Sequence, residues 1–397
     1  MHREDFTMLD NDIVYFDNGA TTLKPKCVVD SMVNYYTKHT SNIHRGDYDA
    51  AVETNRLYDD TRSVVSKFIN SEKDEVIFTS GTTMSINMVV FGYMKNVLKE
   101  GDEVLLTRSE HASNVLPWIK LSEEVGIIIK YMDLDDNYSL TVDSVKKSIT
   151  DKTKVISIAH VTNVIGDVRD IYSIGNICKD MGIIFLVDGA QSVPHMRVDF
   201  KNSNIDFLCF SGHKMCGPTG VGCLVAKKKH LDIMEPIFYG GGMNNYFETN
   251  NSYELKNGVI KFEAGTPPIA EVIGLREAIL YLEKVGIDKI HEHELELKKY
   301  LVKELKSVPN IRIYNEKSDS GILAFNIEGV FAQDSSIYLN NYNIYVRAGN
   351  HCSKMLKDEI GVKNTVRVSM YLYNTKDDVD KLVEVLKKSE DIFKIVI

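Results

Sequence analysis

Short apolar runs alternate with longer amphipathic segments across roughly residues 70–230. The runs are EVIFT (75–79), DEVLLT (102–107), IIIKYM (127–132), VISIAHV (155–161), IIFLVD (183–188), IDFLCF (205–210) and GVGCLVA (220–226). Apolar runs of this length, separated by segments long enough for a helix, are typical of βαβ units. The pattern therefore predicts an α/β fold with a mainly parallel sheet that is covered on both faces.

The pattern changes near residue 270. A long helical stretch covers 270–308, short strands such as IRIY, ILAFNI and IYVRAG follow, and an amphipathic helix is expected over 377–393. We expect a large domain over 15–270 and a smaller α/β domain over 271–397 that closes one side of the site, with residues 1–14 packed against the small domain. No internal repeat or low-complexity linker separates the two parts, so we expect them to be rigidly joined.

Composition and charge narrow the function classes. The 397 residues are 44% hydrophobic and 26% charged, which is ordinary for a globular protein, and the net charge of −9 argues against nucleic-acid binding. No apolar stretch reaches about 18 residues and the N-terminal segment lacks a signal-peptide core, so we expect a cytoplasmic protein without membrane contact. The six cysteines lack paired CxxC spacing, which indicates neither a metal site nor a disulfide framework.

Two charged residues follow neighbouring apolar runs. Asp188 ends IIFLVD, and Lys214 follows IDFLCF within SGHKMCGPTGVG. In open α/β sheets ligands bind at the carboxyl ends of the strands, so both side chains are expected at the site. A pyridoxal phosphate (PLP) site needs a lysine amine that condenses with an aldehyde and a carboxylate that keeps the pyridine nitrogen protonated. Taken singly, a residue such as Asp188 is more often a turn or helix-capping residue, and one such as Lys214 is more often a solvated loop cation. The small residues, hydroxyls and imidazole around both favour PLP.

The segment TSGTTMSIN (79–87) predicts where a phosphate would bind. It places Gly and hydroxyl residues directly before a helical pattern, where free N–H groups and the helix dipole hold anions. Thr82 and Thr83 are the candidates here, and Ser211 and His213 are expected to approach from the far side. The alternative is a plain helix N-cap.

Three further residues are candidates for chemistry. His111, just past DEVLLT, is a candidate to lie flat over the pyridine ring, although a lone histidine is more often a hydrogen-bonded structural residue. Arg367 is a candidate for a bidentate clamp on a substrate carboxylate, the alternative being a surface ion pair. Cys352 differs from the other cysteines because it lies in the polar segment VRAGNHCSKM; the alternative is an inert loop thiol.

Together these segments resemble the class V, fold-type I PLP-dependent family, and within it the Suf-type cysteine desulfurases, also described as selenocysteine lyase-like. The resemblance spans nearly the whole chain and implies a seven-stranded sheet in the large domain. The matching segments are YFDNGATT (15–22), NIHRGDY (42–48), FTSGTTMSIN (78–87), EHASNVLPW (110–118), VDGAQSVPH (187–195), SGHKMCGPTGVG (211–222), FEAGTPP (262–268) and RAGNHC (347–352).

The resemblance implies a role for each candidate around the cofactor. Lys214 would be the lysine joined to PLP, Asp188 the partner of the pyridine nitrogen and Gln191 a donor to the phenolic oxygen. His111 would stack on the ring. The implied phosphate binders are Thr83, Ser211, His213 and, from the other subunit of a homodimer, Thr266.

It also implies the substrate side of the site. Asn163 and Arg367 would hold the amino acid, Arg45 and Arg347 would line the entrance, and Cys352 would be the nucleophile that receives sulfur. The loop departs from the family pattern, with Asn350 in place of a second histidine and no Gln-Pro pair after the cysteine. YGGGMNN (239–245) also lacks the acidic residue often found after the glycines.

The activity implied is the conversion of L-cysteine to L-alanine, with sulfur passing to a persulfide on Cys352 and on to a Suf-type acceptor protein for iron–sulfur cluster assembly or thiolation. Lysis of L-selenocysteine or cysteine sulfinate uses closely related chemistry and stays open. A class V aminotransferase, epimerase or other lyase that makes no use of Cys352 is a second alternative. A PLP-binding scaffold or regulator without enzymatic activity is a third.

Overall fold

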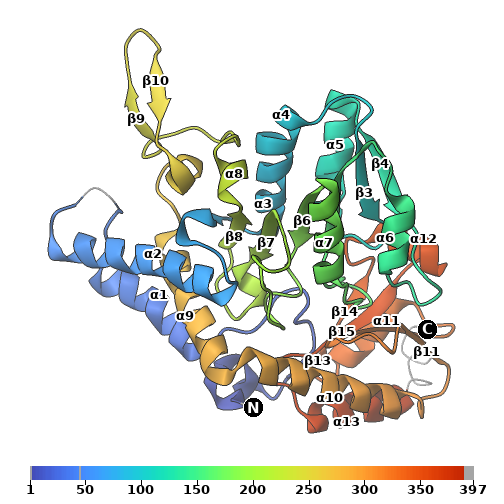
Figure 1. Ribbon diagram of the computed structural model, residues 1–397. Coiled ribbons are helices and arrows are strands. Elements are labelled where there is room, and N and C mark those ends of the chain that lie inside the picture. The colour runs from blue at the N-terminus through green and yellow to red at the C-terminus, as the bar shows by residue number, and fades with distance from the viewer. Residues whose placement is uncertain (1, 44–45, 389–397) are drawn as a thin grey trace.

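The computed structural model describes residues 2–43 and 46–388 (Figure 1). Its centre is a seven-stranded sheet in the order β2-β8-β7-β6-β5-β3-β4, in which β8 alone runs antiparallel to its neighbours. The strands are β2 (Val76–Thr79), β3 (Glu103–Thr107), β4 (Ile128–Met132), β5 (Thr153–Ala159), β6 (Ile184–Asp188), β7 (Phe207–Ser211) and β8 (Gly222–Ala226). Each apolar run of the sequence supplies one strand, so the predicted mainly parallel α/β fold is confirmed.

Helices cover both faces of this sheet because its strands are apolar on both sides. In β6, Phe185 and Val187 belong to one core cluster and Leu186 belongs to the other. The helices over the first face are α1 (Lys26–Lys38), α2 (Asp49–Phe68), α6 (Val142–Ser148), α7 (Ile171–Met181) and α9 (Ile269–Val285). Those over the second are α3 (Thr82–Val89), α4 (Lys95–Val97), α5 (Leu116–Val125) and α8 (Lys228–Leu231).

A second, antiparallel sheet lies in the C-terminal part, in the order β11-β12-β15-β14. Its strands are β11 (Ile311–Tyr314), β12 (Ile322–Ile327), β14 (Arg347–Gly349) and β15 (Thr365–Ser369). Three helices share its core: α10 (Ile287–Leu305), α11 (Ala332–Asn340) and α13 (Lys376–Lys387). A fourth helix, α12 (Lys354–Ile360), lies between β14 and β15 in the sequence.

The expected helical stretch over 270–308 is two helices, because Gly286 adopts a φ of 96° between α9 and α10. Helix α9 packs on α1 and α2 and contributes to the core of the large sheet, although it follows the domain boundary expected at residue 270. That boundary stays a prediction. The expected C-terminal helix is observed to Lys387, and residues 389–393 lie outside the described residues.

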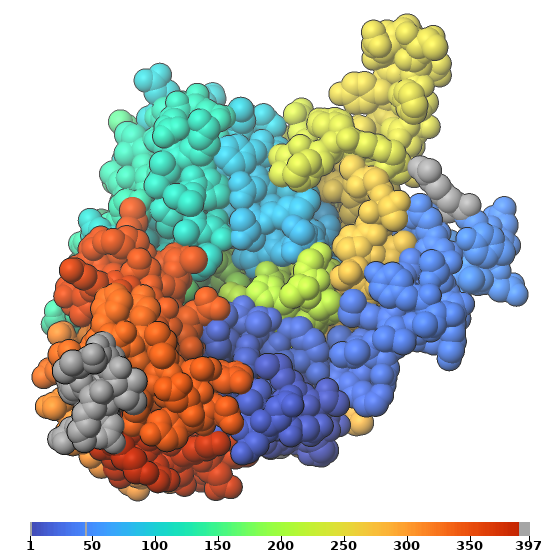
Figure 2. All heavy atoms as spheres, turned by 180° about the vertical axis from the view of Figure 1, so that it is seen from behind, coloured from blue at the N-terminus to red at the C-terminus, as the bar shows by residue number. Residues whose placement is uncertain are grey.

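The N-terminal residues lie against the small sheet and its helices. Strand β1 (Val14–Tyr15) pairs in parallel with β13 (Ile344–Tyr345), and Arg3 forms an ion pair with Asp378 of α13 at 2.9 Å. Figure 2 shows these dark-blue residues beside the orange and red C-terminal part. In both views a hairpin of β9 (Asn244–Phe247) and β10 (Tyr253–Leu255) projects from the body of the molecule.

Candidate active site

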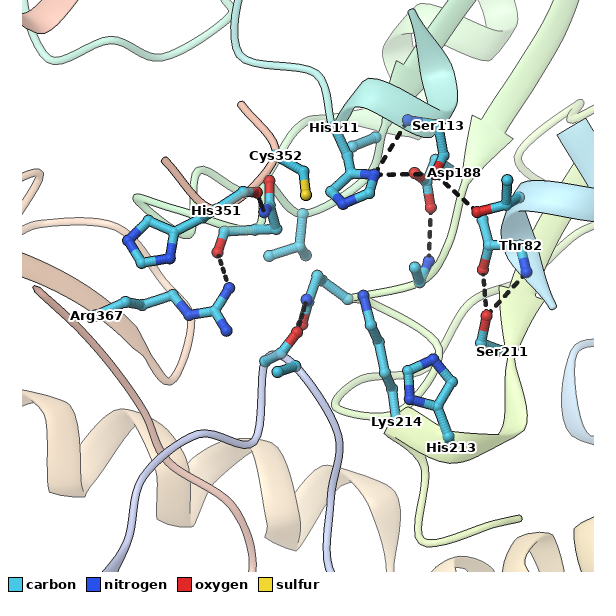
Figure 3. A pocket seen from close by; sticks show the side chains of 18 of the residues that line it. Thr82, His111, Ser113, Asp188, Ser211, His213, Lys214, His351, Cys352 and Arg367 are labelled. Atoms are coloured by element: carbon cyan, nitrogen blue, oxygen red, sulfur yellow. Dashed lines mark hydrogen bonds between the residues drawn. The ribbon is translucent and has the colours of Figure 1, made fainter. Parts of the chain in front are cut away.

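A cavity of about 290 Å³ lies at the carboxyl ends of the central strands, between the two sheets. Its lining brings together the predicted residues Thr82, Thr83, His111, Asn163, Asp188, Gln191, Ser211, His213, Lys214, Arg347, Cys352 and Arg367 (Figure 3). These residues are far apart in the sequence. The sheet gathers them because β3, β5, β6 and β7 are parallel and end at the same edge.

Asp188 and Lys214 line the same cavity from adjacent strands. Asp188 is the last residue of β6, and Lys214 ends the short 3-10 turn Gly212–Lys214 that follows β7. Burial raises the pKa of Asp188 to about 6. The Ala190 N–H, which donates to Asp188 Oδ1 at 2.9 Å, and the charge of Lys214 both act in the opposite direction and lower this pKa. Burial lowers the pKa of Lys214 to about 8, so roughly a tenth of its amine is uncharged and nucleophilic at pH 7, far more than for an ordinary lysine.

The start of helix α3 faces the cavity. Gly81, with a φ of 145°, turns the chain from β2 into the helix, and the backbone N–H of Thr82 donates to Ser211 Oγ at 2.8 Å. The Thr82 and Ser211 hydroxyls lie 2.7 Å apart, and Thr83 Oγ1 lies 2.7 Å from Ser113 Oγ. N–H groups and hydroxyls gathered at a helix N-terminus can hold a phosphate.

His111 is held in one orientation and one tautomer. Its Nδ1 accepts a hydrogen bond from the backbone N–H of Ser113 at 3.1 Å, which leaves the proton of the neutral ring on Nε2. Burial, with help from Lys214, lowers the pKa of His111 to about 4. The same causes, with Lys24 added, lower the pKa of His213 to about 4. Both imidazoles are therefore neutral at physiological pH.

Gln191 has unused hydrogen-bonding capacity inside the cavity. Its Nε2 donates to the Gly19 carbonyl at 2.7 Å, which leaves a second N–H on the same nitrogen. Its Oε1 is buried and has no hydrogen-bond partner among the described residues. A buried amide with open positions fits a site that is completed by a polar ligand.

Arg367 lies in β15 and only 2% of it is exposed, which excludes the surface ion pair considered from the sequence. Its Nη1 donates to the Asn163 carbonyl at 2.8 Å and its Nη2 donates to Asp17 Oδ1 at 3.1 Å, while Nε has no partner among the described residues. Burial lowers the pKa of Arg367 and Asp17 opposes this. Arg347, at the rim, also donates to Asp17, and this hydrogen bond, together with the charge of Asp17, raises the pKa of Arg347.

Cys352 is exposed at the cavity, on a turn between β14 and α12. His351 and Cys352 both adopt left-handed backbone conformations, with φ values of 53° and 55°, which non-glycine residues rarely take. The carbonyl of His351 accepts a hydrogen bond from Asn163 Nδ2 at 2.7 Å, and the carbonyl of Cys352 accepts one from the Ala112 N–H at 2.8 Å. The turn is therefore fixed on both sides.

One predicted residue among those described is not in this cavity. Thr266 lies in a second cavity, where Asn42 Nδ2 donates to its hydroxyl at 3.2 Å. Arg45 lies outside the described residues. Among the described residues no cluster of metal-ligating side chains is found, and no helix there is long and apolar enough to cross a membrane.

Sequence reasoning missed Asp17 and Ser113. Asp17 joins Arg347 to Arg367, and Ser113 orients His111 through its backbone N–H. Both lie inside the segments YFDNGATT and EHASNVLPW that carry the family resemblance, which was the available signal. Their roles depend on contacts between distant segments, which spacing alone does not reveal.

Comparison with known proteins supports the family expected from these segments. A family model described as Aminotransferase class-V matches residues 14–382, and the chain belongs to this family. Its curated relatives over the full length include a probable cysteine desulfurase of Halalkalibacterium halodurans, 40% identical, which covers 98% of this chain and 97% of the relative. A probable cysteine desulfurase of Staphylococcus aureus is 39% identical, with 98% and 96% covered.

Solved structures agree with the sequence relatives. The apo structure of a cysteine desulfurase from Thermococcus onnurineus has a TM-score of 0.94 at 35% identity, covering 97% of this chain and 96% of that chain. A cysteine desulfurase from Escherichia coli, in an S-sulfonic acid form, has a TM-score of 0.93 at 33% identity, with 98% of each chain covered. The expected resemblance to cysteine desulfurases, which are enzymes, is confirmed.

Proposed function

We propose that this protein is a PLP-dependent cysteine desulfurase that moves sulfur from L-cysteine onto Cys352. The observation that carries the proposal is the placement of Lys214, Asp188 and Cys352 around one cavity. An aminotransferase has no need for an exposed thiol at this position. The relatives named above support the same activity.

The residues present fit PLP. Lys214 would hold the cofactor's aldehyde carbon covalently, Asp188 would hold a proton on the pyridine nitrogen, and the start of α3 with Ser211 and His213 would hold the phosphate. The second N–H of Gln191 is available for the phenolic oxygen, and the neutral His111 ring for stacking. When bound, PLP supplies an electron sink that weakens bonds to the substrate's α- and β-carbons.

Arg367 is suited to binding the substrate carboxylate. Its guanidinium is fixed by Asn163 and Asp17, and Nε remains available to a new acceptor. Lys214, once released from the cofactor, lies in the same cavity and would take the α-proton as a base, which its lowered pKa favours.

Cys352 would then attack the substrate sulfur. A bond forms between Cys352 Sγ and that sulfur, the Cβ–S bond breaks, and its electron pair stays on the carbon, which is protonated to give alanine. The sulfur remains on Cys352 as a persulfide for a Suf-type acceptor protein. The turn that fixes Cys352 at the cavity supports this role.

The experiment that tests the function is incubation of purified, PLP-loaded protein with L-cysteine, with alanine and protein-bound persulfide measured together. Equal amounts of both in a single turnover are expected. Amino-group transfer to a keto acid without persulfide would favour the aminotransferase. Parallel assays with L-selenocysteine and cysteine sulfinate determine which of these substrates is preferred.

We further propose that the working unit is a homodimer in which Thr266 reaches the phosphate of the other subunit. Two observations support this: Thr266 lines a different cavity from Lys214, and α1 and α2 expose apolar side chains, namely Val29, Val33, Tyr36 and Val52. Sedimentation should show a dimer. A fully active monomer would contradict it.

A further inference from the structure

Helix α12 carries a lysine in an unusual place. Lys357 has no solvent exposure, although lysine is among the residues least often buried. It lies between Leu356 and Ile360 on the buried side of the helix, and no carboxylate of the described residues forms an ion pair with it. Among the described residues its only side-chain hydrogen-bond partner is the hydroxyl of Thr365, which accepts from Nζ at 2.7 Å. Such a residue is costly to the fold, which suggests a functional reason.

Thr365 joins Lys357 to the turn that carries Cys352. His351 Nε2 lies 3.0 Å from the Thr365 carbonyl and 3.0 Å from its hydroxyl, so the ring donates to Thr365 and Nε2 carries the proton. Cys352 therefore lies between two elements that are tied to the same residue of β15. One is His351, directly before it, and the other is α12, which begins two residues after it.

We propose that Lys357 is a positioning residue for Cys352: through Thr365 it ties helix α12 to strand β15 and so holds the strained turn that presents the thiol. This deepens, and rests on, the proposed sulfur transfer. The left-handed conformations of His351 and Cys352 are strained, and such strain persists only where surrounding contacts hold it. A charged donor makes a stronger hydrogen bond than a neutral one, so the tie is tightest when Lys357 is an ammonium.

The burial of Lys357 makes this tie dependent on pH. His351 faces it from the turn and Arg367 from β15, while Lys354, Asp358 and Lys363 line the solvent side of the same helix end. Burial and the Arg367 charge lower the pKa of Lys357 to about 7, and burial lowers the pKa of His351 to about 2. Between pH 6 and 9 the charge state at the Thr365 contact is therefore set by Lys357.

The test compares Lys357→Met with Lys354→Met, a matched control on the same helix whose lysine is exposed and paired with Asp358. Iodoacetamide labelling and amide hydrogen exchange are followed by peptide mass spectrometry from pH 6 to 9, and neither needs cofactor or cysteine. Cys27, the other exposed cysteine, is the internal reference. The Lys354→Met control should show the same labelling rate of Cys352 and the same amide exchange as the unsubstituted protein.

In Lys357→Met, Cys352 should be labelled severalfold faster and amides 351–353 should exchange faster, with Cys27 unchanged. In the PLP-loaded variant, sulfur transfer to Cys352 should be slower. If Lys357 instead only activated the thiol, its loss would slow both sulfur transfer and labelling of Cys352. In the unsubstituted protein, protection of the turn should decline above pH 7, and the Met variant should lack this decline. Unchanged labelling and exchange at every pH would overturn the proposal.

Thr365→Val removes the hydroxyl that accepts from Lys357, so it tests the same contact. It replaces the Met variant if that variant misfolds, which faster labelling of Cys27 would reveal. It should also speed the labelling of Cys352, and labelling in the double variant should be no faster than in either single variant. An unaffected turn in Thr365→Val would likewise overturn the proposal. Absence of persulfide in the unsubstituted protein would refute the proposed function. The labelling and exchange measurements would still test whether Lys357 holds the turn, because they need neither PLP nor L-cysteine.

Discussion

The side-chain amide of Asn163 donates to the carbonyl of His351 at 2.7 Å, and its oxygen accepts from Ser353 Oγ at 2.9 Å. Both ends of the amide are thus engaged by the residues on either side of Cys352. The family resemblance predicts a substrate-binding role for Asn163, and the observed contacts add a link to the thiol turn.

Asn163→Ala should therefore lower kcat for desulfuration more than it raises KM. The alanine keeps the backbone carbonyl that orients Arg367, so the site for the substrate carboxylate is retained. The turn, in contrast, loses both hydrogen bonds to the Asn163 side chain. Steady-state kinetics would check this, with Ser353→Ala as a milder variant that removes one of the two contacts. A raised KM with unchanged kcat would instead show that the amide mainly holds substrate.

The sequence predicted the large sheet well because its strands are buried on both faces and read as apolar runs. β6 and β7 deliver Asp188 and Lys214 where the rule for strand ends expects them. The contacts of Asp17 and Thr365 were not predictable in this way. Asp17 contacts Arg367 across hundreds of residues, and Thr365 contacts His351 across the whole of α12, so only tertiary packing brings each pair together.

The burial of Lys357 could not be predicted from the sequence pattern either. In MLKDEIG it reads as an ordinary solvated helix cation, because neighbouring Lys354, Asp358 and Glu359 are polar. The structure rotates Leu356, Lys357 and Ile360 inward, so one turn of α12 buries a charge together with two aliphatic side chains. Helical periodicity shows which residues share a face of the helix. It does not show which face is buried when both faces carry charged residues.

Lys357→Met should also raise stability, most strongly at low pH. The folded-state pKa of about 7 lies below the ordinary 10.5, so the unfolded chain binds more protons between these values and the stability of the unsubstituted protein rises with pH there. Below pH 7 the buried charge is carried in full. Thermal unfolding at pH 6 and pH 9 should thus show a larger gain at pH 6. An equal gain at both would mean that Lys357 does not titrate in this range.

Asp188→Asn should keep the fold and bind PLP but lose most turnover. A neutral amide cannot hold the proton on the pyridine nitrogen that lets the ring withdraw electrons. Absorbance of bound cofactor and alanine release would be measured together. Near-normal turnover would show that Asp188 is only a structural residue that accepts from the Ala190 N–H.

Loading of the apo-protein with PLP should accelerate as pH rises through about 8, because only the uncharged amine of Lys214 attacks the aldehyde. A free aliphatic amine of ordinary pKa provides the reference reaction, whose rise lies at higher pH. Stopped-flow absorbance gives both profiles, and borohydride trapping locates the attached lysine. A profile that coincides with the free amine, or trapping at another lysine, would contradict the assignment.

Glu110→Ala should destabilise the protein by about 3–5 kcal/mol, because it leaves the buried charge of Arg169 unpaired. Arg169 Nη1 donates to Glu110 Oε1 at 2.5 Å, and both side chains are fully buried, with Glu110 directly before His111 in the sequence. Chemical denaturation measures the loss. Glu123→Ala, in an exposed pair with Lys120, is the control and should change little. A small effect of Glu110→Ala would mean that Asp167, at 3.4 Å from Arg169, suffices.

Cys352→Ala separates the two halves of the proposed reaction. Lys214, Asp188 and Arg367 remain, so the variant should bind PLP and change its spectrum when L-cysteine is added. It should not form a persulfide or pass sulfur to a protein acceptor, because no other described cysteine lines the cavity. Cys27→Ala, which removes the other exposed thiol, should behave like the unsubstituted protein.

L-selenocysteine offers a further distinction in the same variant. Selenium is the better leaving group and does not need a thiol to accept it, so Cys352→Ala should retain more activity toward L-selenocysteine than toward L-cysteine. Alanine release from both substrates is the measurement. If Cys352→Ala transfers sulfur from L-cysteine at the unsubstituted rate, the thiol is inert, and a lyase or aminotransferase that uses only Lys214 and Asp188 becomes the better account of this site.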